Sequence, residues 1–128
     1  MASITKTYGS LTPTSLNGTT LSGSLQYSGV VNLETNGEEG VEIFIDFAPN
    51  ASGTEGIQIA VHGNDETNTD NLPRAAFDIP HPGDATHQYK SIVLDRVSRF
   101  QVSAVEVDTE SNHGTITVKY KAWSWASA

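Results

Sequence analysis

The sequence predicts an all-β protein: a single antiparallel β-sandwich, of jelly-roll or immunoglobulin-like type, with an extended N-terminal arm. Three observations predict this fold class. Apolar and polar residues alternate with period two in several segments, and no segment carries an apolar stripe of helical period. Gly, Ser, Thr and Asn are abundant while charged residues make up only 17%, a composition typical of turn-rich β proteins. The 128 residues suit one domain.

The clearest expected strand spans residues 41–47, whose alternate residues form one apolar face: Val41, Ile43, Ile45 and Phe47. The alternation returns in residues 57–62. Residues 50–56 between these segments are rich in turn formers, so we expect the two strands to form a β-hairpin.

Four further strands are expected, at residues 75–79, 88–94, 99–107 and 114–123. In the third of these the parity of the apolar residues changes between Ala104 and Val105, which predicts either a β-bulge or burial on both faces. Residues 95–98 are expected to form one helical turn or a tight loop. An immunoglobulin domain proper is disfavoured because the chain contains no Cys.

The first 29 residues differ from the rest, which predicts an N-terminal arm (1–29) followed by a sandwich domain (30–128). Residues 11–29 carry single apolar residues among Ser, Thr, Gly and Asn, so this stretch buries little on its own. One interpretation is a loose terminus with one or two short edge strands. The other is an arm that becomes ordered on a neighbouring subunit or partner. Its anchors are then Leu16, Leu21, Leu25 and Tyr27.

Charge and composition exclude several classes of function. The net charge of −8 disfavours nucleic acid, because phosphate backbones repel an acidic protein. The absence of Cys excludes disulfides, Cys-based zinc sites, iron–sulfur clusters and a thiol nucleophile. No run approaches 18 apolar residues, and the N-terminus shows no secretory-signal pattern, so no membrane association is expected.

Two loops carry candidate metal ligands without a diagnostic spacing. The acidic segment 62–70 offers oxygen ligands for calcium, but neither reading frame has the Gly and Glu of an EF-hand loop. Segment 81–87 contains His81 and His87, with Asp84 as a third candidate, which is a weak sign of a zinc site. The sequence leaves metal binding by either loop open. We assign no metal site and no cofactor.

No set of residues predicts catalysis. The chain lacks the Gly-x-Ser-x-Gly elbow of hydrolases and any Gly-rich phosphate loop. Glu106 and Asp108 share one strand face and are a candidate pair of glycosidase carboxylates, but a solvated strand edge is the commoner reason for such a pair. We therefore expect no catalytic residues and no enzyme activity.

Both tryptophans lie near the C-terminus, at Trp123 and Trp125, and share one strand face. That face is opposite to the one that carries Ile116, Val118 and Tyr120. If those three point to the core, the tryptophans point outward, which favours contact with a partner or local packing. Stacking on a sugar, with Tyr120, is the alternative.

Across residues 30–125 the chain resembles the small virion structural proteins of tailed bacteriophages, in particular capsid decoration (cement) proteins. The resemblance rests on the Met-Ala-Ser start, the Gly/Ser/Thr-rich segment 11–29, and the succession of strands. Those strands are 41–47, 57–61, 89–94, 99–102 and the closing strand 114–123.

The resemblance implies a β-sandwich or jelly roll, often a homotrimer, that sits on the capsid surface of a virion and braces the shell. Its partner is then the major capsid protein, contacted through Leu16, Leu21, Leu25, Tyr27, Trp123 and Trp125. It implies no catalytic or cofactor residues. The alternative function is a phage tail or fibre component, or a carbohydrate-binding β-sandwich module that uses Trp123, Trp125 and Tyr120.

Overall fold

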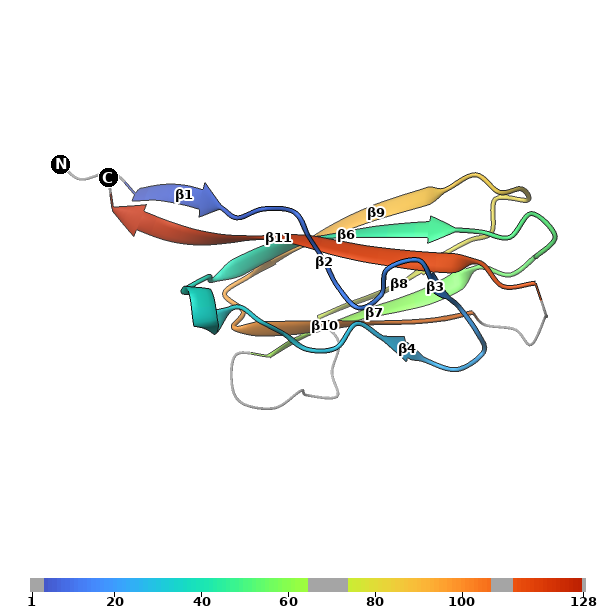
Figure 1. Cartoon of the computed structure of the whole chain (residues 1–128), viewed down its shortest axis with the longest axis horizontal. Helices are drawn as coiled ribbons and strands as arrows, with labels where there is room; N and C mark the ends of the chain where they lie inside the picture. The colour runs from blue at the N-terminus through green and yellow to red at the C-terminus, as the bar shows by residue number, and fades with distance from the viewer. Residues whose placement is uncertain (1–3, 65–73, 107–111, 128) are drawn as a thin grey trace.

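The computed structural model describes residues 4–64, 74–106 and 112–127, and shows two antiparallel β-sheets packed as a sandwich (Figure 1). The fold class is therefore confirmed. In the part of the chain that is described, no helix is long and apolar enough to cross a membrane.

The first sheet has the strand order β1-β11-β6-β9, and the second has the order β4-β10-β7-β8. The strands of the first sheet are β1 (Ile4–Tyr8), β11 (Thr115–Ser127), β6 (Gly40–Ala48) and β9 (Gln88–Asp95). Those of the second are β4 (Gln26–Tyr27), β10 (Arg99–Glu106), β7 (Ile57–Asn64) and β8 (Ala75–Ile79). The short elements are β2 (Thr12–Pro13), β3 (Thr19–Thr20), β5 (Val31–Asn32) and the 3₁₀ turn η1 (Glu34–Asn36).

The strand order is that of a jelly roll. β1, β2 and β3 all pair with β11, one after another, and so form one interrupted strand along it. β4 and β5 pair with β10 in the same way. With these counted as the first and second strands, the sheets run first-eighth-third-sixth and second-seventh-fourth-fifth. This is the two-Greek-key arrangement of a jelly roll rather than of an immunoglobulin domain.

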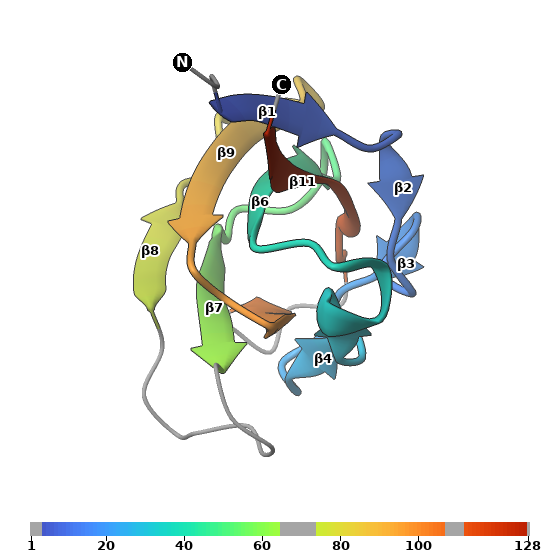
Figure 2. The same cartoon turned by 90° about the vertical axis from the view of Figure 1, so that its left-hand side faces the viewer.

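The N-terminal segment is an integral part of this sandwich, which corrects the expectation of an extended arm. Leu16 and Leu21 are 2% and 1% exposed and belong to the hydrophobic core. The backbone of Val118 in β11 accepts a hydrogen bond from the N–H of Thr14 and donates one to the carbonyl of Leu16. Figure 2 shows β1, β2, β3 and β4 following one side of the sandwich. The change at residue 29 is thus one of composition, whereas the packing is continuous across it.

The downstream strands match the expected segments, but the expected hairpin is absent. β6 pairs with β11 and β9, whereas β7 pairs with β10 and β8. The turn formers of residues 50–56 therefore carry the chain from one sheet to the other. The turn at 95–98 is tight and has Arg96 at φ 56°.

The parity change in β10 is resolved as burial on both faces. The pairing of β10 with β7 runs without a bulge from Arg99 opposite Asn64 to Glu106 opposite Ile57. Phe100, Val102 and Ala104 face the core, and Ser103 on the opposite face is only 3% exposed. Glu106 shares the alternation of Phe100, Val102 and Ala104, so its carboxylate lies at a core position.

Candidate interaction surface

The first sheet ends in a projecting two-stranded ribbon. β11 pairs with β6 as far as Trp123, which lies opposite Gly40. Beyond that point, among the strands that the structure describes, β11 pairs with β1 alone, as far as Ser127 opposite Ile4. Figure 1 shows this ribbon extending past the rest of the sandwich and carrying both ends of the described chain.

Trp123 packs against the base of this ribbon on the outward face of the first sheet. Gly40 leaves room for the indole: a Cβ added there would lie 2.3 Å from Trp123 Cε2. The Tyr8 ring meets the indole edge-on with 5.9 Å between centroids, and Lys6 Nζ lies 3.8 Å from the indole centroid. Trp123 is 2% exposed, with Tyr8 and Lys6 lying against its ring and Gly40 leaving the space that the indole fills.

Trp125, two residues further along, stays open to solvent. It is 46% exposed, and Lys6 Nζ lies 5.7 Å from its ring centroid. Trp125 lines a hollow of about 450 Å³ together with Glu39, Asp95 and Arg96, at the place where β6 and β9 stop and β11 continues. A large indole beside a hollow is the kind of side chain that gains free energy when a partner covers it.

The same outward face carries further exposed apolar side chains. Tyr89 and Val93 of β9 are 71% and 58% exposed, and Tyr8 is 51% exposed. Charged residues lie among them, including Glu42 opposite Lys121 across the β6–β11 pair. We call this surface the aromatic face, defined by its exposed members Tyr8, Tyr89, Val93 and Trp125.

The structure separates the residues expected to form the interface. Leu16, Leu21 and Trp123 are buried within the chain itself, so their side chains are not available to a partner. This corrects their assignment as contact residues. Leu25 and Tyr27 are each 50% exposed, but Tyr27 lies opposite Ser103 on the outward face of the second sheet, away from Trp125.

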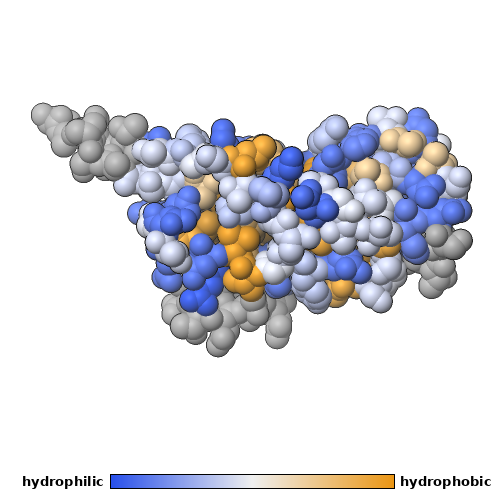
Figure 3. All heavy atoms as spheres, in the orientation of Figure 1, coloured by the Kyte–Doolittle hydropathy of each residue, from blue (hydrophilic) through white to orange (hydrophobic). Residues whose placement is uncertain are grey.

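Figure 3, which views the molecule from the side of β2, β3 and β4, shows hydrophobic residues exposed among hydrophilic ones there.

The expected sugar platform of Trp123, Trp125 and Tyr120 is not formed. Tyr120 is partly buried against the core, with its ring edge-on to Phe100 and 5.3 Å between centroids. Trp123 is covered by the ribbon. Only Trp125 of the three presents a ring to solvent.

The candidate metal ligands of the 81–87 loop, His81, Asp84 and His87, form polar contacts with other protein atoms. His81 Nδ1 accepts a hydrogen bond from the Gly83 N–H, so its Nε2–H donates to the carbonyl of Asn50, 2.8 Å away. His87 Nδ1 lies 2.8 Å from an Asp46 carboxylate oxygen. The hydroxyl and backbone N–H of Thr86 hold the pKa of the Asp84 carboxyl below its usual range.

Over the residues with described positions, no group of three His, Asp or Glu side chains could hold a metal ion. The acidic segment 62–70 lies outside the described residues from Asp65 onward.

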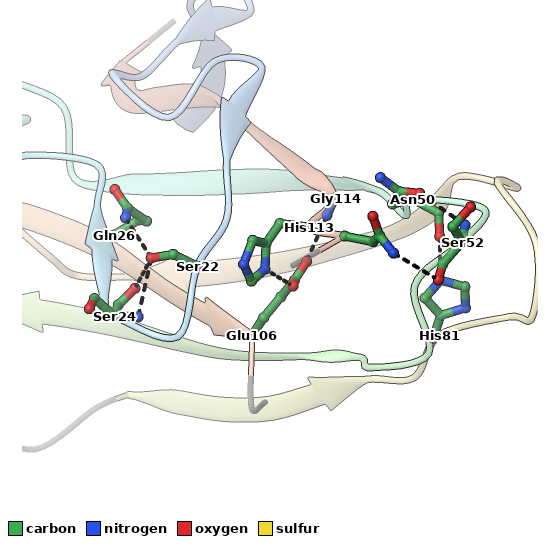
Figure 4. A network of polar contacts seen from close by, with 10 residues as sticks. Ser22, Ser24, Gln26, Asn50, Ser52, His81, Glu106, His113 and Gly114 are labelled. Carbon is green, nitrogen blue, oxygen red and sulfur yellow. Dashed lines mark hydrogen bonds and ion pairs between the residues drawn. The ribbon is translucent and has the colours of Figure 1, made fainter. Parts of the chain in front are cut away.

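Glu106 forms a buried polar site at the end of β10 (Figure 4). Its side chain is 2% exposed, and its two oxygens lie 2.7 Å from the Gly114 N–H nitrogen and 2.5 Å from His113 Nδ1. The expectation of a solvated edge carboxylate is therefore wrong for Glu106, while Asp108 lies outside the described residues. The contacts of Glu106 with His113 and Gly114 join the end of β10 to the start of β11, which is a structural role.

Sequence reasoning missed Tyr8, Tyr89 and Val93. A signal for the β9 pair was present, because residues 89 and 93 share the solvent parity of a period-two strand. The sequence carries no such signal for Tyr8, because the isolated apolar residues before residue 30 do not reveal which strand they join.

No family model matches the chain, and no curated protein matches it. Solved structures do. The chain is similar to the vertex protein P5 of PRD1, with 12% identity over 91% of this chain and 99% of that one, at a TM-score of 0.51. It is also similar to part of BuGH86, crystallised in complex with neoagarooctaose, with 12% identity over 98% of this chain and 20% of that one, at a TM-score of 0.53.

A third similar structure is a family 35 carbohydrate-binding module from Clostridium thermocellum, with 13% identity over 92% of this chain and 97% of that one, at a TM-score of 0.46. At 12% identity, the similarities to the vertex protein and to the part of BuGH86 establish the fold alone. The class that fold and comparisons define is an all-β sandwich of jelly-roll type.

Proposed function

We propose that this protein is a non-enzymatic virion structural protein, a capsid decoration protein that binds the major capsid protein on the outer surface of the shell and stabilises it. Three lines support the proposal. The sequence resembles phage decoration proteins, the strand order is that of a jelly roll, and one similar structure is a vertex protein of PRD1. Jelly rolls serve widely as capsid domains, although a fold by itself does not fix a function.

The observation that carries the proposal is the aromatic face. Tyr8, Tyr89, Val93 and Trp125 are each between 46% and 71% exposed on one outward surface. Scattered single apolar residues are normal, but four on one face, with a tryptophan beside a hollow, fit a docking surface. Aromatic side chains contribute most of the binding free energy in many protein interfaces.

The net charge of −8 keeps the free protein soluble despite this surface.

We further propose that the protein acts as a homotrimer. Closed rotational symmetry presents the same docking face several times, so a weak single contact yields a strong total attachment.

Binding to empty shells assembled from the major capsid protein of the same virus tests the proposal. We expect the protein to co-sediment with the shells in a saturable, stoichiometric manner and to raise the temperature at which they break. A protein that stays in the supernatant at all concentrations contradicts the proposed function. Light scattering tests the homotrimer separately. A measured mass equal to that of one chain contradicts the proposed trimer.

A further inference from the structure

The outward face of the second sheet contains a groove that the proposed function does not use. Its volume is about 380 Å³, within the range of roughly 300–1,000 Å³ typical of small-molecule sites. The groove runs over β10, β7 and β8, with Leu25 at its edge. The lining residues on this face are Leu25, Gln58, Ala60, Ala76, Asp78, Ser103 and Val105.

The strand register explains why this face is hollowed. Ser103, Ala60 and Ala76 lie opposite one another on β10, β7 and β8, so three small side chains form one row across the sheet. Tyr27 lies opposite Ser103 on β4 and ends the row with a half-exposed ring. A flat molecule can therefore approach the strands closely while its edge meets an aromatic ring.

The next row supplies polar groups of mixed character. Val105, Gln58 and Asp78 lie opposite one another, so the amide of Gln58 and the carboxylate of Asp78 share one row of the groove. Gln58 both donates and accepts, whereas the Asp78 carboxylate only accepts.

Ser103 is the most informative residue in the groove. It is the most buried of the outward-facing residues that line the groove, at 3% exposure. The Ser103 hydroxyl is open to the groove, so solvent satisfies it in the free protein. A ligand hydroxyl in the groove can take the place of that water.

We propose that this groove binds a neutral saccharide, with a sugar ring lying over the small-residue row. A pyranose offers a face of C–H groups for Leu25, which lines the groove, and for Tyr27, which lies opposite Ser103 on the neighbouring strand. Its rim of hydroxyls can both donate to Asp78 and exchange hydrogen bonds with Gln58 and Ser103. None of the groove-lining residues is a cation, and the chain carries a net charge of −8, so an anionic ligand is disfavoured. This site is separate from the aromatic face and does not depend on the proposed capsid role.

The test is NMR titration of the ¹⁵N-labelled full-length protein with neutral oligosaccharides of glucose, galactose and mannose at millimolar concentration. An acidic oligogalacturonate and a Lys-rich peptide serve as alternative probes. We expect at least one neutral sugar to shift the amide signals of residues 58–60, 76–78 and 103–105. Tyr27→Ala and Ser103→Val are each expected to weaken its binding about tenfold or more.

Tyr89→Ala is the matched control, because it removes an exposed tyrosine from a strand of the other sheet. It should leave sugar binding unchanged, and circular dichroism verifies that every variant is folded. Should Ser103→Val fail to fold, Gln58→Leu replaces it. The proposal is overturned if no neutral sugar binds, if only the acidic sugar or the peptide binds, or if the shifts map to Trp125. None of these outcomes bears on shell binding, which is measured separately.

Discussion

The Glu106 carboxylate, at 2% exposure, lies 2.5 Å from the Nδ1 atom of His113 and accepts a second hydrogen bond from the backbone N–H of Gly114. A carboxylate at an inward position of a core strand is costly unless its oxygens are paired. Both oxygens are paired here, and the two partners lie directly before β11. The carboxylate therefore clamps the connection between the two sheets at the end away from the ribbon.

Replacing Glu106 should destabilise the fold. We expect Glu106→Ala to lower the free energy of unfolding by about 2–4 kcal/mol, because it leaves the Gly114 N–H and the His113 ring without their partner and opens a cavity. Urea denaturation followed by fluorescence measures the change. The matched control is Glu34→Ala, since the Glu34 side chain is 60% exposed. A loss for Glu106→Ala no larger than that of the control would show that the clamp contributes nothing.

Gly40 should not tolerate a side chain. A Cβ at this position meets the Trp123 indole at 2.3 Å, so Gly40→Ala must displace the ring from beneath Tyr8 and Lys6. We expect a loss of about 1–3 kcal/mol, typical of overpacking, together with a red shift of tryptophan emission. Gly9→Ala is the control, because its Cβ would come no closer than 3.4 Å to its neighbours. Unchanged emission in Gly40→Ala would contradict the packing described for Trp123.

The leucines of the N-terminal segment should behave as core residues. Leu16→Ala and Leu21→Ala are each expected to cost about 2–5 kcal/mol, the usual cost of removing a buried leucine side chain. Leu11→Ala, at a position 51% exposed, should change the unfolding free energy by less than about 0.5 kcal/mol. Equal, small effects at all three positions in denaturant unfolding would restore the interpretation of a loose arm.

The period-two segments could be predicted because their pattern records burial directly. Residues 75–79 coincide with β8, and residues 88–94 fall within β9. Strand partners could not be predicted in the same way, because alternation does not encode which strand lies beside which. For that reason the turn formers at 50–56 suggested a hairpin where the chain instead crosses between sheets.

The N-terminal strands escaped prediction for a different reason. The segment along β11 is divided into the short strands β1, β2 and β3, so no run is long enough to alternate. Leu16 and Leu21 enter the core singly, between the short strands. Trp123 was expected to be exposed because its parity is outward, but the side chains of Tyr8 and Lys6 from the neighbouring strand β1 lie against its ring.

The most direct test of the account compares shell binding by Trp125→Ala and Tyr27→Ala. Both residues are about half exposed, so neither change should unfold the protein, but they lie on opposite sheets. We predict that Trp125→Ala weakens the apparent affinity for capsid shells about tenfold or more in co-sedimentation, while Tyr27→Ala binds as the unaltered protein does. Normal binding by Trp125→Ala, with loss of binding by Tyr27→Ala, would contradict the assignment of the aromatic face.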